Sequence, residues 1–171
     1  MNTVEYQVDE EGWVTPGDLG AWLRARDLLD GAGDDAPTSD DLALALTIRE
    51  GLRSVLATHA GHDADTAAIA RLDDALAELP VRVSFAAADG FGLLPASGRP
   101  VRRALARVVE AVRASTEEGT WPRLKVCDRD SCRWAYYDYS KNRSGRWCTM
   151  AGCGNAVKMQ KAHARRSGGA A

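Results

Sequence analysis

The segments Cys127-Asp-Arg-Asp-Ser-Cys132 and Cys148-Thr-Met-Ala-Gly-Cys153 contain all four cysteines of this 171-residue chain. Both have the spacing C-x4-C, at the long end of the range typical of zinc-binding turns, and fifteen residues separate them. Two close pairs can surround one metal ion tetrahedrally, so we expect all four thiolates to hold a single Zn²⁺. A site with four protein ligands leaves no position open for water, which makes the zinc structural.

Other uses of four cysteines are disulfides, an iron–sulfur cluster or free thiols. Disulfides are rare in a reducing compartment, and the start of the sequence has no basic-then-apolar leader that would indicate secretion. No run of closely spaced cysteines of the iron–sulfur type is present. Zinc in a cytoplasmic protein is the interpretation that we favour.

The residues around the cysteines predict a small ribbon. Leu124 and Val126 alternate into the first cysteine, and Trp134 and Tyr136 alternate out of the second. The polar run 140–145 reads as a turn. Such a ribbon is too small to be stable without its metal.

A basic helix is expected after the last cysteine, over residues 156–166. Asn155 is the expected N-cap, and Gly154 is expected to adopt a left-handed conformation before it. Cys153 would then lie at a helix N-terminus, where the dipole favours a thiolate. The cationic residues Lys158, Lys161 and Arg165 fall on one face of this helix.

Charge is distributed unevenly along the chain. Residues 1–120 carry 11 basic and 21 acidic residues, a net −10, whereas residues 121–171 carry 11 basic and 3 acidic residues, a net +8. With four thiolates and one Zn²⁺ the second value becomes +6. A basic module on an acidic body indicates binding to a polyanion, and a solvated cationic C-terminus is the alternative.

Seven basic side chains are therefore candidate DNA contacts, three around the ribbon turn and four on the helix: Lys141, Arg143, Arg146, Lys158, Lys161, Arg165 and Arg166. Aromatic residues of the ribbon could also stack on bases. For Trp134, Tyr136 and Trp147 a place in the small core of the ribbon is the expectation, which leaves Tyr137 and Tyr139 as candidates for stacking.

The first 120 residues predict a helical body. Helix starts are expected at Thr15-Pro16 and at Thr38, and the expected helices end at glycines 31 and 33 and at Gly61. Further helices are predicted over 64–79 and 100–117. Between them, residues 81–85 and 91–94 read as a β-hairpin with a turn at 89–90.

The predicted fold is mainly α with a small β-hairpin, an α+β class. A helical domain (1–120) precedes a zinc-ribbon or treble-clef-like finger (121–166) that ends in the basic helix, and 167–171 form a disordered tail. Residues 119–122 would be the hinge between the two domains.

No catalytic constellation stands out, so an enzyme is not expected. His59 and His62 are close in sequence, but a helix C-terminus explains them better than a metal site does. An enzymatic body would gain support from a deep pocket lined by Arg24, Arg26, Arg102 or Arg103 and able to hold a small anion. No apolar run approaches the roughly 20 residues needed to span a membrane.

The finger resembles the CGNR-type zinc finger. The resemblance covers about forty residues: the stretch Cys132 to Ser140, the Arg-Trp-Cys ending at Cys148, then Cys153-Gly-Asn, and Lys158. Ala156 stands where that family has its Arg. The resemblance implies zinc binding by the four cysteines and DNA binding by the finger.

CGNR-type fingers follow a helical domain called ABATE in bacterial proteins described as stress-induced transcription regulators, and residues 1–120 resemble that domain. Asn2-Thr3 is similar to an Asn-Thr pair of the family that follows an apolar strand, which is missing here. We therefore expect a zinc-dependent DNA-binding regulator whose body senses a small ligand or dimerises. The alternative is a zinc-stabilised protein–protein interaction module that does not bind DNA.

Overall fold

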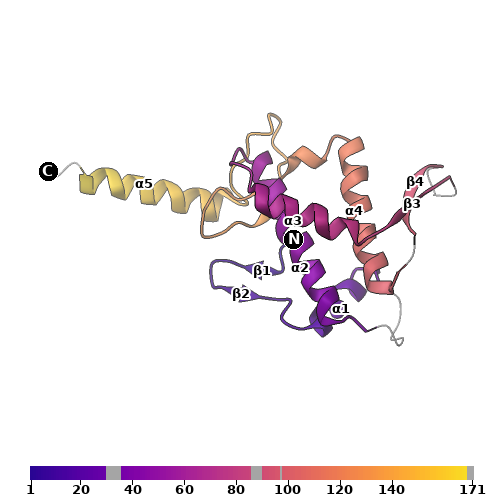
Figure 1. Ribbon diagram of the computed structural model, residues 1–171. Helices are drawn as coiled ribbons and strands as arrows, with labels where there is room; N and C mark the ends of the chain where they lie inside the picture. The colour runs from indigo at the N-terminus through magenta and orange to yellow at the C-terminus, as the bar shows by residue number, and fades with distance from the viewer. Residues whose placement is uncertain (30–35, 86–89, 97, 169–171) are drawn as a thin grey trace.

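The computed structural model describes residues 1–29, 36–85, 90–96 and 98–168. A helical body carries the small module predicted as the finger, and the last helix, α5, extends away from both (Figure 1). The helices are α1 (Pro16–Arg24), α2 (Ser39–His59), α3 (Thr66–Ala77), α4 (Pro100–Glu117) and α5 (Asn155–Gly168). The described part of the chain contains no helix that is both long and apolar enough to cross a membrane.

The first two helices begin where the sequence predicts. Thr15 and Thr38 each form a capping box, with Asp18 and Asp41 respectively, so that side chain and backbone bond reciprocally at each N-terminus. Helix α1 ends at Arg24, earlier than expected, and the predicted glycine stop at 31–33 lies outside the described residues. Gly61, with φ of +88°, follows the end of α2 as predicted.

Helix α2 is central to the body, because α1, α3 and α4 all pack against it. Its apolar face contributes Leu44, Ala45 and Ile48 to the core. The contact with α3 is close at Gly51, where a Cβ atom would come within 2.5 Å of the Cβ of Leu72. A side chain at this position would push the two helices apart, so the glycine serves packing rather than backbone freedom.

Three two-stranded antiparallel sheets complete the described fold. Strands β3 (Val81–Ser84) and β4 (Gly92–Pro95) form the predicted hairpin, and its turn lies partly outside the described residues. Strands β5 (Leu124–Val126) and β6 (Ala135–Tyr137) form the predicted ribbon. The pair β1 (Val4–Glu5) and β2 (Glu10–Glu11) was not foreseen.

The junction between body and finger is packed. A 3-10 turn, Trp121–Arg123, leads from α4 directly into β5, and β5 lies against α2. Both histidines at the end of α2 contact the finger: His59 Nδ1 lies 2.8 Å from the carbonyl oxygen of Leu124, and His62 lies 3.0 Å from a carboxylate oxygen of Asp128. The expected hinge is therefore a contact region, and the histidines do more than end a helix.

Buried arginines of α2 reinforce this junction. Arg53, with 1% of its surface exposed, donates to the carbonyl oxygens of Arg133 (2.8 Å) and Met1, and pairs with Glu50. Asn2 bonds both backbone groups of Ala135 in β6, at 2.7 and 2.8 Å. The N-terminal segment, α2 and the ribbon are thereby joined by one polar network.

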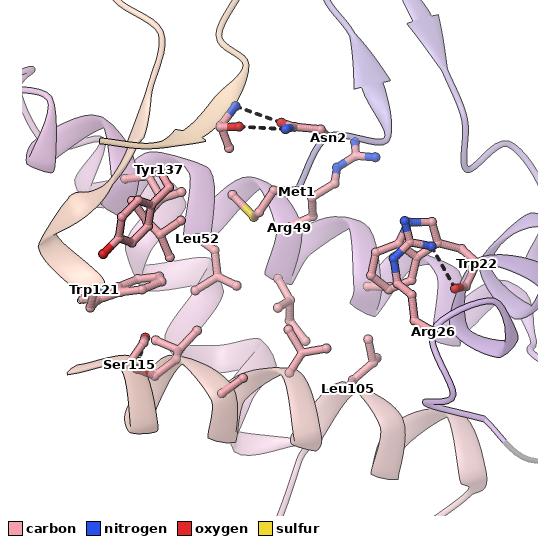
Figure 2. A pocket seen from close by; sticks show the side chains of 18 of the residues that line it. Met1, Asn2, Trp22, Arg26, Arg49, Leu52, Leu105, Ser115, Trp121 and Tyr137 are labelled. Carbon is pink, nitrogen blue, oxygen red and sulfur yellow. Dashed lines mark hydrogen bonds between the residues drawn. The ribbon is translucent and has the colours of Figure 1, made fainter. Parts of the chain in front are cut away.

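A cavity of about 520 Å³ lies where the body meets the ribbon (Figure 2). Its walls come from α1, α2 and α4 on the body side and from β5 and β6 on the finger side. Of the four arginines named above as possible anion ligands, only Arg26 lines it. Arg102 instead pairs with Asp41 and Glu78.

Candidate metal centre

The first cysteine pair lies on a tight turn between β5 and β6. Cys127 follows β5, and its N–H donates to the carbonyl oxygen of Trp134 across the ribbon (2.9 Å). The N–H of Cys132 donates to the carbonyl oxygen of Arg129 (2.8 Å), which closes the turn. Arg133 then takes a left-handed conformation, with φ of +49°, and returns the chain to β6.

The second pair lies at the start of the last helix, which begins earlier than predicted. A π-helical turn, Met150–Gly154, precedes α5, and Thr149 caps it by accepting from the N–H of Gly152 (3.2 Å). Asn155 already has helical angles, so the expectation that it caps the helix was wrong. Cys153 still lies in the first turn of the helical segment, as expected.

Gly154 has a role different from the predicted one. The φ angle of Gly154 is not positive, so this residue does not adopt the predicted left-handed conformation. A Cβ atom here would lie 2.4 Å from Sδ of Met150 and 2.9 Å from Cδ1 of Trp147. The glycine is required because the π-helical turn folds back onto the Trp147 ring.

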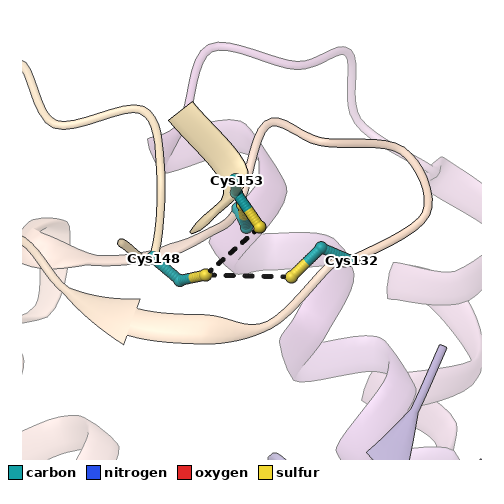
Figure 3. A group of neighbouring side chains, drawn as sticks. Cys132, Cys148 and Cys153 are labelled. Atoms are coloured by element: carbon teal, nitrogen blue, oxygen red, sulfur yellow. Dashed lines mark hydrogen bonds between the residues drawn. The ribbon is translucent and has the colours of Figure 1, made fainter. Parts of the chain in front are cut away.

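The four sulfur atoms lie within 4.8 Å of one another. Cys148 Sγ is 3.7 Å from that of Cys153 and 3.8 Å from that of Cys132 (Figure 3). A tetrahedron with zinc–sulfur bonds of about 2.3 Å has sulfur–sulfur edges of about 3.8 Å. A disulfide would need sulfur atoms about 2.05 Å apart, and all four cysteines are free. The geometry therefore fits one structural zinc ion.

The surroundings shift the pKa values of three of the four cysteine thiols. Burial, followed by neighbouring thiols, raises the pKa of Cys132 to about 11 and that of Cys148 further above its usual value. Burial opposes ionisation of Cys153 too, but hydrogen bonds from Cys132 and Arg129 outweigh it and lower its pKa. Thiolates that lie this close repel one another, and a metal cation offsets that repulsion.

Arg129 supports the centre and was missed by the sequence analysis. Its guanidinium lies 3.9 Å from Sγ of Cys153 and donates to Oε1 of Gln7 (3.1 Å). A cation beside a thiolate favours its ionised form. The position inside the C-x4-C turn is the only sequence signal that could have indicated this residue.

A buried ion pair stiffens the rest of the finger. Lys125 Nζ lies 2.8 Å from Oδ2 of Asp138, and it also donates to the carbonyl oxygens of Arg143 and Gly145. Burial alone would raise the pKa of Asp138, but hydrogen bonds from Lys125, Ser140 and the Gly145 N–H hold it well below its usual range. The pair fixes the turn 140–145 to the ribbon.

Gly145 allows this pair to form. A Cβ atom at this position would lie 2.7 Å from Oδ1 of Asp138. The close approach of backbone to carboxylate therefore needs a residue without a side chain. Its carbonyl oxygen also accepts from the hydroxyl of Tyr136 (2.7 Å), which places that ring in the ribbon as predicted.

Some of the other aromatic side chains of the finger are packed inside the protein, and others are exposed to solvent. Trp147 packs against the cysteine cluster, as expected for a core residue. Trp134 is exposed, contrary to expectation. Tyr137 lines the large cavity, and its ring lies 4.6 Å from that of the exposed Tyr139.

The predicted basic residues have different surroundings. Arg146 is paired with Asp128 and lies over the Trp147 ring, so its charge is already matched. Lys141 and Arg143 are exposed on the turn. The four helix residues are exposed, and none of them has a carboxylate within ion-pair distance in the described ranges: Lys158, Lys161, Arg165 and Arg166.

Helix α5 has little support from the rest of the molecule. It packs mainly against the π-helical turn that precedes it, and from Lys158 to Arg166 every side chain is exposed. Met159 is 72% exposed. The helix extends to Gly168, two residues beyond the predicted end of the finger, and 169–171 lie outside the described residues.

The fold and the cysteine cluster define a zinc-finger protein with a helical N-terminal domain. Residues 123–166 match the family described as CGNR zinc finger. Residues 1–115 match ABATE, described as "Putative stress-induced transcription regulator", and because this match covers more than half of the chain, the chain belongs to the ABATE family. Both families are of regulator or zinc-finger type rather than enzymes. No curated protein matches the chain.

Proposed function

We propose that this protein is a zinc-dependent, DNA-binding transcription regulator whose finger contacts DNA and whose helical body senses a ligand. The observation that carries the DNA part is the unmatched positive charge on α5. Some basic side chains elsewhere in the described chain, such as Lys125 and Arg49, are paired with carboxylates, whereas no ion pair in the described ranges involves the four on α5. Cations without such partners on a projecting helix suit a polyanionic partner.

The dimensions of α5 suit a DNA groove. Its 14 residues span about 21 Å at 1.5 Å per residue. The major groove of DNA is about 12 Å wide and admits a helix. Lys158, Lys161 and Arg165 share one face, so they can contact successive phosphates along a groove. Arg166, Lys141 and Arg143 would add phosphate contacts, and we expect less from Arg146 because Asp128 neutralises it.

A salt series tests this proposal. The zinc-loaded protein is titrated with a fluorescent DNA duplex between 50 and 200 mM salt, and log Kd is plotted against log salt. Replacing Lys158, Lys161 and Arg165 together by Gln should reduce the slope by about 3, close to one per lost phosphate contact.

The matched control replaces three exposed arginines of the body, Arg24, Arg71 and Arg82, by Gln. It removes the same charge and should leave the slope unchanged. Undetectable binding at low salt, or equal slopes for the two triple variants, would contradict the proposal.

The alternative is a module that binds an acidic protein. The exposed Met159 in the middle of the basic helix favours it, because a thioether among cations suits a peptide surface better than phosphates. On this alternative the same titration shows no DNA binding for the wild-type protein. The two functions are therefore separated by one measurement.

A further inference from the structure

The cavity between body and ribbon has an apolar middle and two aromatic ends (Figure 2). Leu52 and Leu105 line the middle, from α2 and α4. Trp22 stands at one end, whereas Trp121 and Tyr137 stand at the other. At about 520 Å³, its volume lies within the range of ligand sites, about 300–1,000 Å³.

Two cationic side chains reach the cavity, and they differ in their partners. Arg49 is satisfied: it bonds both carboxylate oxygens of Glu11 at 2.7 Å and also pairs with Glu50. Arg26 is exposed and stacks over the Trp22 ring at 3.9 Å; among the described residues, the acceptor for its guanidinium is the Trp22 carbonyl oxygen (3.2 Å). No carboxylate in the described part of the chain forms an ion pair with it.

A second donor lies at the same end of the cavity, on Trp13. Trp13 lines the cavity and is 6% exposed, and its indole Nε1 has no hydrogen-bond partner among the described residues. Its ring packs edge-on against Trp22, at 5.2 Å between centroids. Buried donors in folded proteins are almost always satisfied, so an orphaned donor on a residue that lines a cavity is a candidate to bind an acceptor on a ligand.

We infer that this cavity binds an organic anion with a flat apolar ring system, its carboxylate accepting from Arg26 and Trp13 and its rings lying toward Trp121 and Tyr137. Guanidinium and indole N–H groups both donate and neither accepts, so they select an acceptor with negative charge. The aromatic walls select a planar apolar body. The inference rests on the proposed regulatory function for its biological meaning, but the site itself does not depend on DNA.

The position of the cavity also indicates how a ligand would act. Leu124, Ala135 and Tyr137 of the finger form part of its wall, opposite α4. A molecule that contacts both the ribbon and the body stabilises the packing of the ribbon against the body. Ligand binding should therefore be coupled to any property that depends on the position of the finger relative to the body.

The test uses 9-anthracenecarboxylate as probe and 9-anthracenemethanol as its neutral analogue, with zinc-loaded full-length protein and no DNA. Binding is followed by quenching of tryptophan fluorescence and by calorimetry. We expect the carboxylate to bind at least tenfold more tightly than the alcohol. Arg26→Gln should remove this preference while leaving the affinity for the alcohol unchanged.

Arg24→Gln is the matched control, because Arg24 is exposed near the same end of α1 but does not line the cavity. It should bind both probes as the wild type does. Val108→Phe, which fills the cavity, should weaken the binding of both probes at least tenfold. Zinc content and circular dichroism check that this variant is folded. Absence of carboxylate binding up to 1 mM, equal affinity for the two probes, or equal behaviour of the Arg26 and Arg24 variants would overturn the inference, whatever the DNA titration shows.

Discussion

The two ends of the zinc finger differ in what they contact. At the ribbon end, Arg53 of α2 bonds the carbonyl oxygen of Arg133, and Asn2 bonds both backbone groups of Ala135. At the other end, α5 projects from the rest of the molecule (Figure 1). It packs mainly against the turn that precedes it, and its side chains from Lys158 to Arg166 are exposed. One end of the module is therefore anchored to the body, and the other projects from it.

The difference between the two ends distinguishes charged side chains that stabilise the fold from charged side chains that a partner could contact. Lys125 lies on the ribbon, 5% exposed, with Asp138 as partner, so its charge holds the turn in place. Lys161 on α5 has no such partner in the described ranges. An isolated helix of this length is marginally stable in water. The capped turn at Thr149 and the zinc site start the helix, and a partner that binds it would stabilise the rest.

The largest effect should come from breaking the metal centre, to which both ends are attached. Cys153→Ser removes one of four ligands, and structural zinc contributes on the order of 10 kcal/mol to such modules. We expect loss of stoichiometric zinc by elemental analysis and loss of amide protection over the whole finger. The body should stay folded, but the last turns of α2 should lose protection, because His59 and Arg53 bond to the finger.

The control for this variant is Ser131→Ala, an exposed change within the first cysteine turn. It should retain about one zinc per chain. If Cys153→Ser leaves protection of α2 unchanged, the ribbon is not anchored as described. If it keeps one zinc, the centre is not the four-cysteine site.

The next largest effect should come from the anchored end. Arg53→Ala removes a side chain that is 1% exposed and leaves the carbonyl oxygens of Arg133 and Met1 without their donor. Breaking a buried charged network of this kind costs about 3–5 kcal/mol. Urea unfolding measures this change in the free energy of unfolding.

Arg71→Ala on α3 is the matched comparison, because Arg71 is exposed and no described contact involves its guanidinium. It should change stability by less than about 0.5 kcal/mol. Similar changes in the free energy of unfolding for the two arginine variants would mean that the network around Arg53 does not anchor the finger to the body.

The sequence predicts the zinc ligands and most elements because both depend on local patterns. Cysteine spacing determines the metal site, and a Thr followed three residues later by Asp determines each capping box at Thr15 and Thr38. The start of the last helix was misplaced because the π-helical turn at Met150–Gly154 leaves no periodic signal. The role predicted for Gly154 was wrong, because a glycine is needed there for the close approach of Met150 and Trp147. The sequence alone does not reveal such a contact.

Long-range contacts could not be predicted. Arg53 and Asn2 lie far in sequence from Arg133 and Ala135, and nothing in their neighbourhoods indicates those partners. For the same reason the sequence ranks Arg146 with Lys158 as a DNA contact, although only the first is neutralised by Asp128. Composition predicts the charge of the finger, but the fold decides which charges remain available.

The smallest of these effects concerns Glu11, at the edge of the anchoring network. A hydrogen bond from Arg49 is the main reason that the pKa of Glu11 lies below its ordinary value of 4.5, with a further bond from the N–H of Trp13. The ionised carboxylate therefore stabilises the folded state at pH above about 4.5, and this contribution is lost as pH falls through the lowered pKa. Glu11→Gln should cost about 1–2 kcal/mol at pH 7, because a charge-assisted bond is replaced by a neutral one.

The difference in unfolding free energy between Glu11→Gln and wild type should be constant from pH 7 to 5 and should shrink as the pH falls below about 4.5 through the lowered pKa of Glu11. Glu10→Gln is the control, since Glu10 is exposed in the same short strand. Loss of zinc in acid affects all three proteins alike, so it cancels in the comparison. A difference that stays the same at every pH where the protein remains folded, or an equal loss in the Glu10 variant, would mean that Arg49 is held by packing alone. The anchored network would then not extend to the hairpin of β1 and β2.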